Sequence, residues 1–187
     1  MSAPTTTPRL APLTDDELSE DQRALLDPMG QRGSMNIFRT MIRHPRMYRH
    51  WSGFGGWLLQ RSSFEPRVRE TIILRAAFRS GATYEWGHHV PLGREAGLSD
   101  DEMLAIAGRG EPAPDAALLV TAVDEIFDNH CIGDATWAAL AQRFDEQQLI
   151  ELPMLAGHYR LLAGTLNSLG VELEDGYPSF GEVEVGA

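Results

Sequence analysis

The chain has 187 residues, enough for one ordinary domain with a sizeable core, and 43% of them are hydrophobic, as in globular proteins. The formal net charge of -11 at pH 7 argues against nucleic acid and anionic membranes as partners, although a local pocket can still be basic. The single cysteine, Cys131, excludes an intrachain disulfide and a zinc site built from several cysteines. The sequence shows no signal-peptide pattern and no run of about 18 apolar residues, so we expect a cytoplasmic protein without a transmembrane helix.

Capping residues and hydrophobic spacing predict helices through the first part of the chain. Residues 1–12 are rich in Thr, Pro and Ala and are expected to form a flexible or docked arm. Thr14 and Glu17 have the capping-box spacing, so a helix is expected from there to just before Pro28. Further helices are predicted in "NIFRTMIRHP", in "RMYRHWSGFGGWLLQRSS" and in "PRVRETIILRAAFRSG". The last of these is apolar nearly all round, which is typical of a buried helix.

The rest of the chain continues the helical pattern. "TYEWGHHVPLGREAG" is predicted to be a helix that closes at Gly97, and "SDDEMLAIAGRG" a short capped one. "PDAALLVTAVDEIFDNH", "DATWAALAQRF" and "DEQQLIELPMLAGHYRLLAGTLNSLG" all have a period of 3.6 residues. No segment alternates as a strand does. We therefore predict an all-α fold of about eight helices, with a single domain over residues 13–170 and an acidic tail over residues 171–187.

Glu70 is a candidate acid or base because of its neighbours on a helical wheel. It lies between Leu74 and Ala77, with Arg67 as the nearest base one turn back. A carboxylate flanked by apolar side chains is partly desolvated, which raises its pKa toward the range useful for proton transfer. The alternative is a structural ion pair with Arg67 or another arginine.

Glu85 and His89 are also predicted to point toward the core. They share a stripe with Leu92, whereas Tyr84 and His88 fall on a different face of the same helix. One turn apart, Glu85 and His89 can touch and titrate as a coupled pair. The alternative is a core histidine that is simply hydrogen-bonded to a glutamate. Glu85 and His88 have the Glu-x-x-His spacing of di-iron bundles, but no second copy occurs, so we expect no metal and no cofactor.

The stretch "RETIILRAAFRSGATYEWGHHVPLGREAGLSDDEMLAI" resembles the core segment of the carboxymuconolactone decarboxylase family, which includes alkyl hydroperoxidase D (AhpD). The likeness consists of Arg-Glu at the head of an apolar helix, a small-residue turn, then Tyr-Glu-Trp-x-x-His and "AGLSDDE", and it places the core motif at residues 66–107. It implies an AhpD-like all-α domain that assembles as a dimer, trimer or hexamer around a pocket near this segment.

The resemblance also implies a site. In the peroxidase branch the active site contains a glutamate, a Cys-x-x-Cys pair and a histidine four residues after the second cysteine. These positions fall on Glu70, Ala82, Glu85 and His89 in this chain, so both thiols are missing. The resemblance therefore favours the branch without dithiol chemistry, with Glu70, Glu85 and His89 as the site.

The leading hypothesis is a carboxymuconolactone decarboxylase-like lyase or isomerase that transfers a proton on a small carbonyl or lactone acid without a cofactor. His89 is expected to move the proton, Glu85 to orient His89, and Glu70 to act as a second acid or base. The residues expected to line the substrate pocket are Trp51, Tyr84, Trp86, His88 and Tyr159.

Two alternatives stay open. The first is an AhpD-like oxidoreductase or peroxidase that uses an external thiol or a bound metal. The second is a non-catalytic helical oligomer that binds a small ligand or a partner protein. This last alternative predicts a closed core, in which Glu85 and His89 satisfy each other and no cavity opens beside them.

Overall fold

A computed structural model describes residues 8–184 of the chain, and all regular structure in that range is helical. The predicted all-α class is thus confirmed. The elements in chain order are η1 (Asp15–Glu17), α1 (Glu20–Leu26), η2 (Asp27–Ser34), α2 (Asn36–Met41), α3 (Pro45–Gln60), α4 (Pro66–Arg79), α5 (Thr83–Glu95), α6 (Asp100–Ile106), α7 (Pro114–Asn129), α8 (Asp134–Ala141) and α9 (Glu146–Leu169). Among the residues described, no helix is both long and apolar enough to cross a membrane.

The first predicted helix is divided in two. Thr14 and Glu17 form the expected capping box, but it closes only the short turn η1. Ser19 then forms a second capping box with Gln22 and starts α1. A capping box is a local arrangement, so each Ser or Thr followed by Glu or Gln can begin its own element. The expected loop that follows contains the 3-10 helix η2, which is broken at Gly30, where φ is +57°.

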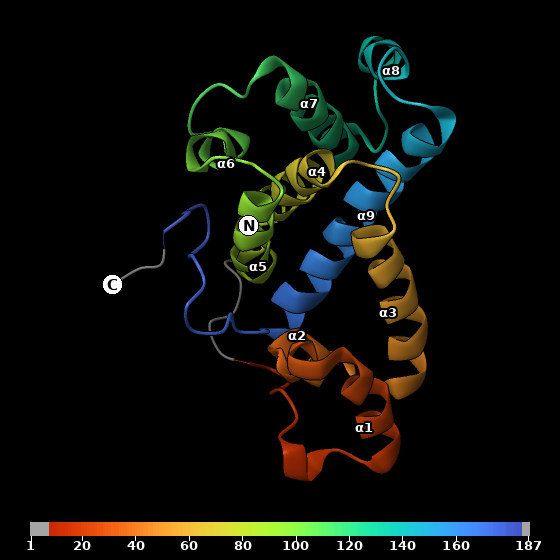
Figure 1. Cartoon of the computed structure of the whole chain (residues 1–187), viewed down its shortest axis with the longest axis vertical. Helices are drawn as coiled ribbons and strands as arrows, with labels where there is room; N and C mark the ends of the chain where they lie inside the picture. Colours follow the sequence, from red (N-terminus) through yellow and green to blue (C-terminus); the bar gives the residue numbers. More distant parts are fainter. Residues whose placement is uncertain (1–7, 185–187) are drawn as a thin grey trace.

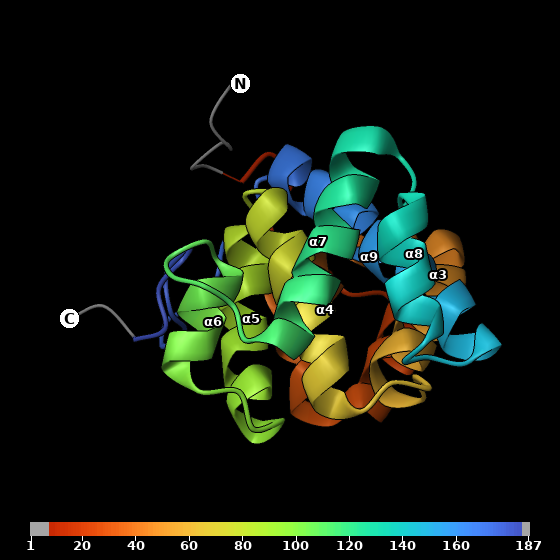
Figure 2. The same cartoon turned by 90° about the horizontal axis from the view of Figure 1, so that it is seen from above.

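Helix α4 lies at the centre of the molecule and packs against α5, α7 and α9 (Figures 1 and 2). Its residues Ile72, Ile73, Leu74, Ala76 and Ala77 are completely buried. A helix with apolar residues on every side needs neighbours on every side, and α4 has them. Glu70, which also belongs to α4, is completely buried as well.

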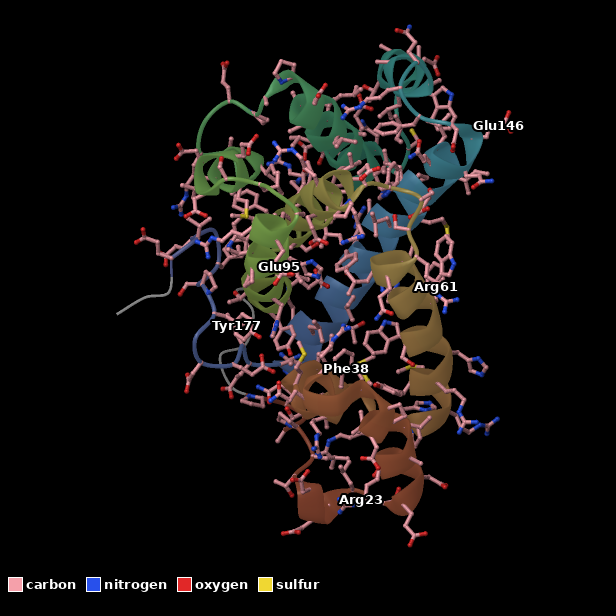
Figure 3. All side chains as sticks on the ribbon, viewed as in Figure 1. Arg23, Phe38, Arg61, Glu95, Glu146 and Tyr177 are labelled. Carbon is pink, nitrogen blue, oxygen red and sulfur yellow. The ribbon has the colours of Figure 1, made fainter. Side chains whose placement is uncertain are left out.

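Three apolar clusters form the core around α4. One joins α4 to α7, α8 and α9, and a second joins α2 and α3 to α5 and α9. Phe38, labelled in Figure 3, belongs to the second cluster. The third cluster packs α5 and α6 against the end of the chain through Trp86, Phe180 and Val183. These clusters hold α3, α5 and α9 as the frame of the site described below.

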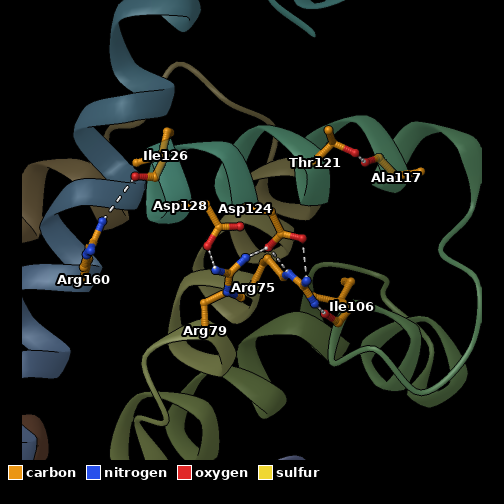
Figure 4. Close-up of polar contacts among 9 residues, drawn as sticks. All are labelled: Arg75, Arg79, Ile106, Ala117, Thr121, Asp124, Ile126, Asp128 and Arg160. Atoms are coloured by element: carbon orange, nitrogen blue, oxygen red, sulfur yellow. Dashed lines mark hydrogen bonds and ion pairs between the residues drawn. The ribbon is translucent and has the colours of Figure 1, made fainter. Parts of the chain in front are cut away.

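A polar network also fixes α4 against α7 (Figure 4). Arg75 donates from Nε and Nη2 to the two carboxylate oxygens of Asp124, at 2.7 and 2.6 Å, and from Nη1 to the carbonyl oxygen of Ile106 at 2.8 Å. Arg79 pairs with both Asp124 and Asp128. Bidentate arginine–carboxylate pairs add orientation as well as energy, so the network restrains the rotation of α4.

The two ends of the described chain run across the helices. Residues 1–7 of the predicted arm lie outside the described residues, whereas Arg9 and Leu10 donate their backbone N–H groups to the carbonyl of Leu169 at 2.8 and 3.3 Å. Residues 171–184, here called the C-terminal segment, pass beside α5 (Figures 1 and 2). This segment packs closely, because a Cβ atom added at Gly87 would lie 2.6 Å from a methyl carbon of Leu173.

Candidate active site

Glu70 and His89 form a buried pair at the contact between α4 and α5. The Nδ1 atom of His89 lies 2.7 Å from Oε2 of Glu70, and Arg69 donates from Nε to the other carboxylate oxygen at 3.1 Å. Glu70 is completely buried and His89 nearly so. A carboxylate partner assigns the proton of a neutral imidazole to Nδ1, and this leaves the lone pair on Nε2. Glu70 therefore orients His89.

The expected hydrogen bond between Glu85 and His89 is not formed. Both carboxyl oxygens of Glu85 are buried and have no hydrogen-bond partner in the described part of the chain. The one-turn spacing brings the two residues to one face, but Glu70 from the neighbouring helix occupies the Nδ1 atom of His89. Burial raises the pKa of Glu85 well above its ordinary value, because an unpaired charge is costly away from water. The shift favours the protonated form of Glu85, and it is Glu70, not Glu85, that bonds Nδ1 of His89.

A cavity of about 1010 Å³ opens beside Glu85 and His89, which both lie on its wall. Residues of α3, α5 and α9 surround it, and η2 and α2 close one end. Four of its lining residues, Phe38, Arg61, Glu95 and Tyr177, are labelled in Figure 3, where they lie around the space between α3 and α5. Glu70 does not line the cavity and lies behind His89.

Four of the five predicted wall residues line this cavity, namely Trp51, Tyr84, His88 and Tyr159. The fifth, Trp86, does not. Its ring is completely buried on another side of α5, and its indole N–H donates to the carbonyl of Glu182 at 2.6 Å. Trp86 packs instead in the third apolar cluster, with Leu74, Val90 and Phe180.

His88 belongs to a second polar cluster at the cavity wall. Its Nε2 atom lies 2.6 Å from Oε2 of Glu174, and its ring contacts those of Tyr84 and Tyr177, with centroids 4.5 and 4.0 Å away. Glu174 also accepts a hydrogen bond from the Tyr84 hydroxyl at 2.9 Å and one from the backbone N–H of Asn36 at 2.6 Å. The C-terminal segment thus supplies part of the site, which its acidic, Gly- and Pro-containing sequence does not indicate.

Tyr159 and His158 of α9 face the same cavity. The ring of Tyr159 is edge-on to that of His89 at 5.0 Å. Burial raises the pKa of Tyr159 well above its ordinary value, and the negative charge of Glu70 acts in the same direction, so the hydroxyl is a neutral donor. Burial lowers the pKa of His158, which favours a neutral imidazole. His158 was not predicted as a site residue, because one histidine among apolar residues resembles ordinary core.

The model of the carboxymuconolactone decarboxylase family matches residues 45–126, from the start of α3 into α7. Residues 45–126 belong to the carboxymuconolactone decarboxylase family. The predicted resemblance is thereby confirmed, and Glu70, Glu85 and His89 all lie within the matched segment. Among curated proteins, none has a sequence that matches the chain.

Solved structures of AhpD-like proteins share the fold. An alkylhydroperoxidase AhpD core protein from Ralstonia eutropha JMP134 superposes with a TM-score of 0.73 at 13% identity, over 89% of this chain and 93% of that one. A putative antioxidant defence protein AhpD from Agrobacterium tumefaciens has a TM-score of 0.63 at 19% identity, over 71% and 93%. The debrominase Bmp8 without ligand has a TM-score of 0.70 at 13% identity, over 91% and 94%.

The carboxymuconolactone decarboxylase segment contains no cysteine. The resemblance to the family implies that the peroxidase thiol positions correspond to Ala82, which is buried before α5, and to Glu85. Cys131 is exposed and does not line the cavity. Within residues 8–184, no three His, Cys, Asp or Glu side chains gather as metal ligands would. The groups on the cavity wall include the imidazole of His89 and the carboxyl group of Glu85.

Proposed function

We propose that the chain is a carboxymuconolactone decarboxylase-like enzyme that transfers a proton, without a cofactor, on a carbonyl or lactone acid. One observation carries the proposal. The imidazole of His89, held by Glu70, and the unpartnered acid of Glu85 lie on the wall of the same cavity. Acid–base enzymes use such a pair at neutral pH: one group acts as a base and the other as a neutral acid, because their surroundings push their pKa values apart.

In an isomerisation, Nε2 of His89 takes a proton from the carbon next to a carbonyl group and returns it to another carbon. Glu70 stabilises the imidazolium that forms between these steps, because its carboxylate bonds Nδ1. The carboxylic acid of Glu85 donates a hydrogen bond to the oxygen on which negative charge develops. Positioned acids and bases of this kind contribute roughly 10²–10⁴-fold in rate.

In a decarboxylation, the bond between the substrate carbon and its carboxylate breaks, and carbon dioxide leaves. The electron pair moves into the enolate, whose oxygen accepts a hydrogen bond from Glu85. The imidazolium of His89 then protonates the carbon, and the neutral imidazole regains a proton from solvent. Both reactions use the same two groups, so the site supports a lyase or an isomerase.

The alternatives have less support. A purely structural role for Glu85 and His89 predicts that they pair in a closed core, but Glu85 has no partner in the described chain and a cavity lies beside both. A thiol peroxidase needs a sulfur atom at the site, and Ala82 and Glu85 occupy the corresponding positions. A redox mechanism would have to rely on an external thiol or a bound metal.

The test measures proton transfer directly. The purified protein is incubated in deuterium oxide with a panel of β-keto acids and γ-lactone acids that includes carboxymuconolactone, and exchange and decarboxylation are followed by NMR. His89→Gln is expected to lower the rate roughly 10²–10⁴-fold, and Glu85→Gln to lower it as well. His50→Gln, which changes an exposed histidine of α3 outside the cavity, is the matched control.

Equal rates for the wild type and His89→Gln would remove His89 from the mechanism. A parallel assay measures consumption of an alkyl hydroperoxide with dithiothreitol as the external thiol. Turnover in this assay, together with no proton transfer on any acid of the panel, would replace the proposal with the redox alternative.

A further inference from the structure

The cavity carries an excess of basic side chains on an acidic protein. The chain has a formal net charge of -11, yet four arginines, Arg32, Arg49, Arg61 and Arg69, line the cavity. Among the described residues of the lining, the carboxylic acids are Glu85 and Glu95, and burial raises the pKa of Glu85 well above its ordinary value. A concave site lined by one sign of charge concentrates ligands of the opposite sign. The cavity is therefore suited to an anion.

Arg32 and Arg69 are two of the arginines that line the cavity. The positive charges of both act to lower the pKa of Tyr159, whose ring is edge-on to that of His89. Arg69 uses Nε for Glu70, which leaves its two terminal nitrogens available. Arg32 reaches the cavity from η2, and within residues 8–184 its side chain makes no hydrogen bond or ion pair. An arginine without an internal partner can donate hydrogen bonds to the carboxylate of a ligand.

The size and the wall residues of the cavity indicate what kind of group the ligand carries besides its anion. Pockets for drug-sized ligands measure roughly 300–1,000 Å³, so a cavity of about 1010 Å³ is at the upper end of that range. A small lactone acid would leave most of it to water. Aromatic rings of Phe38, Tyr48, Trp51 and Trp57 line it. Along α3, a Cβ atom added at Gly53 or Gly56 would meet nothing within 4 Å.

We propose that the cavity binds a bulky aromatic carboxylate with at least two rings. The carboxylate lies between Arg32 and Arg69, and the rings pack against the aromatic and glycine positions of α3. This inference deepens the proposed function by naming its substrate class, because a carboxylate held there brings the adjacent carbons toward His89 and Glu85. Aromatic walls bind planar rings by stacking and by burial of apolar surface.

The first test measures charge recognition by calorimetry. The wild type is expected to bind 2-naphthoate about tenfold or more tightly than the neutral isostere 2-naphthamide, because hydrogen bonds between charged groups are about twice as strong as neutral ones. Arg32→Met should remove this preference and leave 2-naphthamide binding unchanged. Arg46→Met changes an exposed arginine of α3 that does not line the cavity, and it is expected to behave as the wild type.

The second test measures size. Gly56→Leu fills the space against α3 and is expected to weaken 2-naphthoate about tenfold or more, with benzoate little affected, because leucine and the second ring would occupy the same volume. Gly53→Leu is a second variant of the same kind. Gly164→Leu in α9 is the matched control, since it also has open space around its Cβ position but does not line the cavity.

Equal binding of 2-naphthoate and 2-naphthamide, or no effect of Arg32→Met, would overturn the carboxylate position. Equal binding by Gly56→Leu, Gly53→Leu and the wild type would overturn the position of the rings. These experiments measure binding alone and are repeated in His89→Gln. If the wild type shows both binding preferences but turns over no acid of the panel, the proposed function fails and the ligand class stands.

Discussion

Glu85 combines full burial with an unpartnered carboxyl group. Unfolding exposes this group to water and returns it to its ordinary acidity. The folded protein therefore holds a proton at Glu85 over a pH range in which the unfolded chain has released it. This difference makes a residue-scale prediction, because proton binding by the folded state alone links stability to pH.

The prediction concerns Glu85→Gln. The pKa of Glu85 is raised on folding, so the stability of the wild type falls as pH rises above the ordinary value of 4.5 and continues to fall until the folded group ionises. Glutamine cannot ionise. The variant should therefore gain stability relative to the wild type as pH rises, by at most about 1.4 kcal/mol per pH unit.

Urea unfolding at pH 5, 6.5 and 8 measures this effect. Glu95→Gln is the control, because Glu95 is an exposed glutamate at the same cavity. If the wild type and Glu85→Gln show parallel pH dependence, Glu85 is not protonated in the folded protein.

The positions of individual site residues could be predicted from the sequence, but their hydrogen-bond partners could not. Helical periodicity correctly directs Glu85 and His89 inward, since that depends only on residues a turn apart. The partner of His89 depends on how α4 and α5 pack, and periodicity within α5 says nothing about Glu70 on α4. Arg67, expected beside Glu70, instead binds Glu102 and the carbonyl of Gly97. Arg69, next to Glu70 in sequence, fills that place.

At the element scale, helices with strong local signals were predictable and the C-terminal segment was not. Helix α4 is apolar on every side, α6 has a capping box, and both have nearly the expected bounds. The C-terminal segment has no periodicity, and hydrogen bonds and contacts with α5 and α2 position its described residues. Contacts between residues about 90 positions apart, such as Tyr84 and Glu174, leave no local pattern in the sequence.

Gly87→Ala tests how closely this segment packs on α5. The added methyl group would approach Leu173 to 2.6 Å and the carbonyl of Pro178 to 3.0 Å, so the segment must shift. We expect a loss of roughly 1–3 kcal/mol in the free energy of unfolding and faster proteolysis after residue 170. Gly157→Ala in α9 has open space at its Cβ position and should be neutral or stabilising by up to about 1 kcal/mol.

Urea unfolding and limited proteolysis with mass spectrometry measure the two effects. Equal stability and equal cleavage of Gly87→Ala and Gly157→Ala would show that the C-terminal segment does not rest on α5 in solution.

At the scale of the whole molecule, the site is assembled from both inside and outside the family segment. Residues 45–126 supply Glu70, Glu85 and His89, and these could be located from the sequence. Arg32 from η2, His158 and Tyr159 from α9 and Tyr177 from the C-terminal segment lie outside it. Of these four, only Tyr159 was expected at the site. The walls, and with them the ligand class, follow from tertiary packing.

We further propose that the chain forms homo-oligomers, as its resemblance to the family implies. Large apolar side chains are exposed on α3 and α9, and they include Phe54, Trp57, Ile150, Met154 and Leu161. Exposed apolar patches commonly mark protein interfaces. Sedimentation equilibrium should give at least twice the mass of one chain, and Met154→Glu with Leu161→Glu should reduce it. A single-chain mass for the wild type at all concentrations would contradict this proposal.

The position of Glu174 affects the order in which the protein can be completed during synthesis. All eleven helical elements in the described range end by residue 169, but Glu174 and Tyr177 follow them. A growing chain can therefore form its helices and its apolar clusters around α4 while one wall of the cavity is still missing. The hydroxyl of Tyr84 and the ring of His88 receive their carboxylate only after Glu174 has left the ribosome. This wall of the cavity therefore forms after the helical frame that holds it.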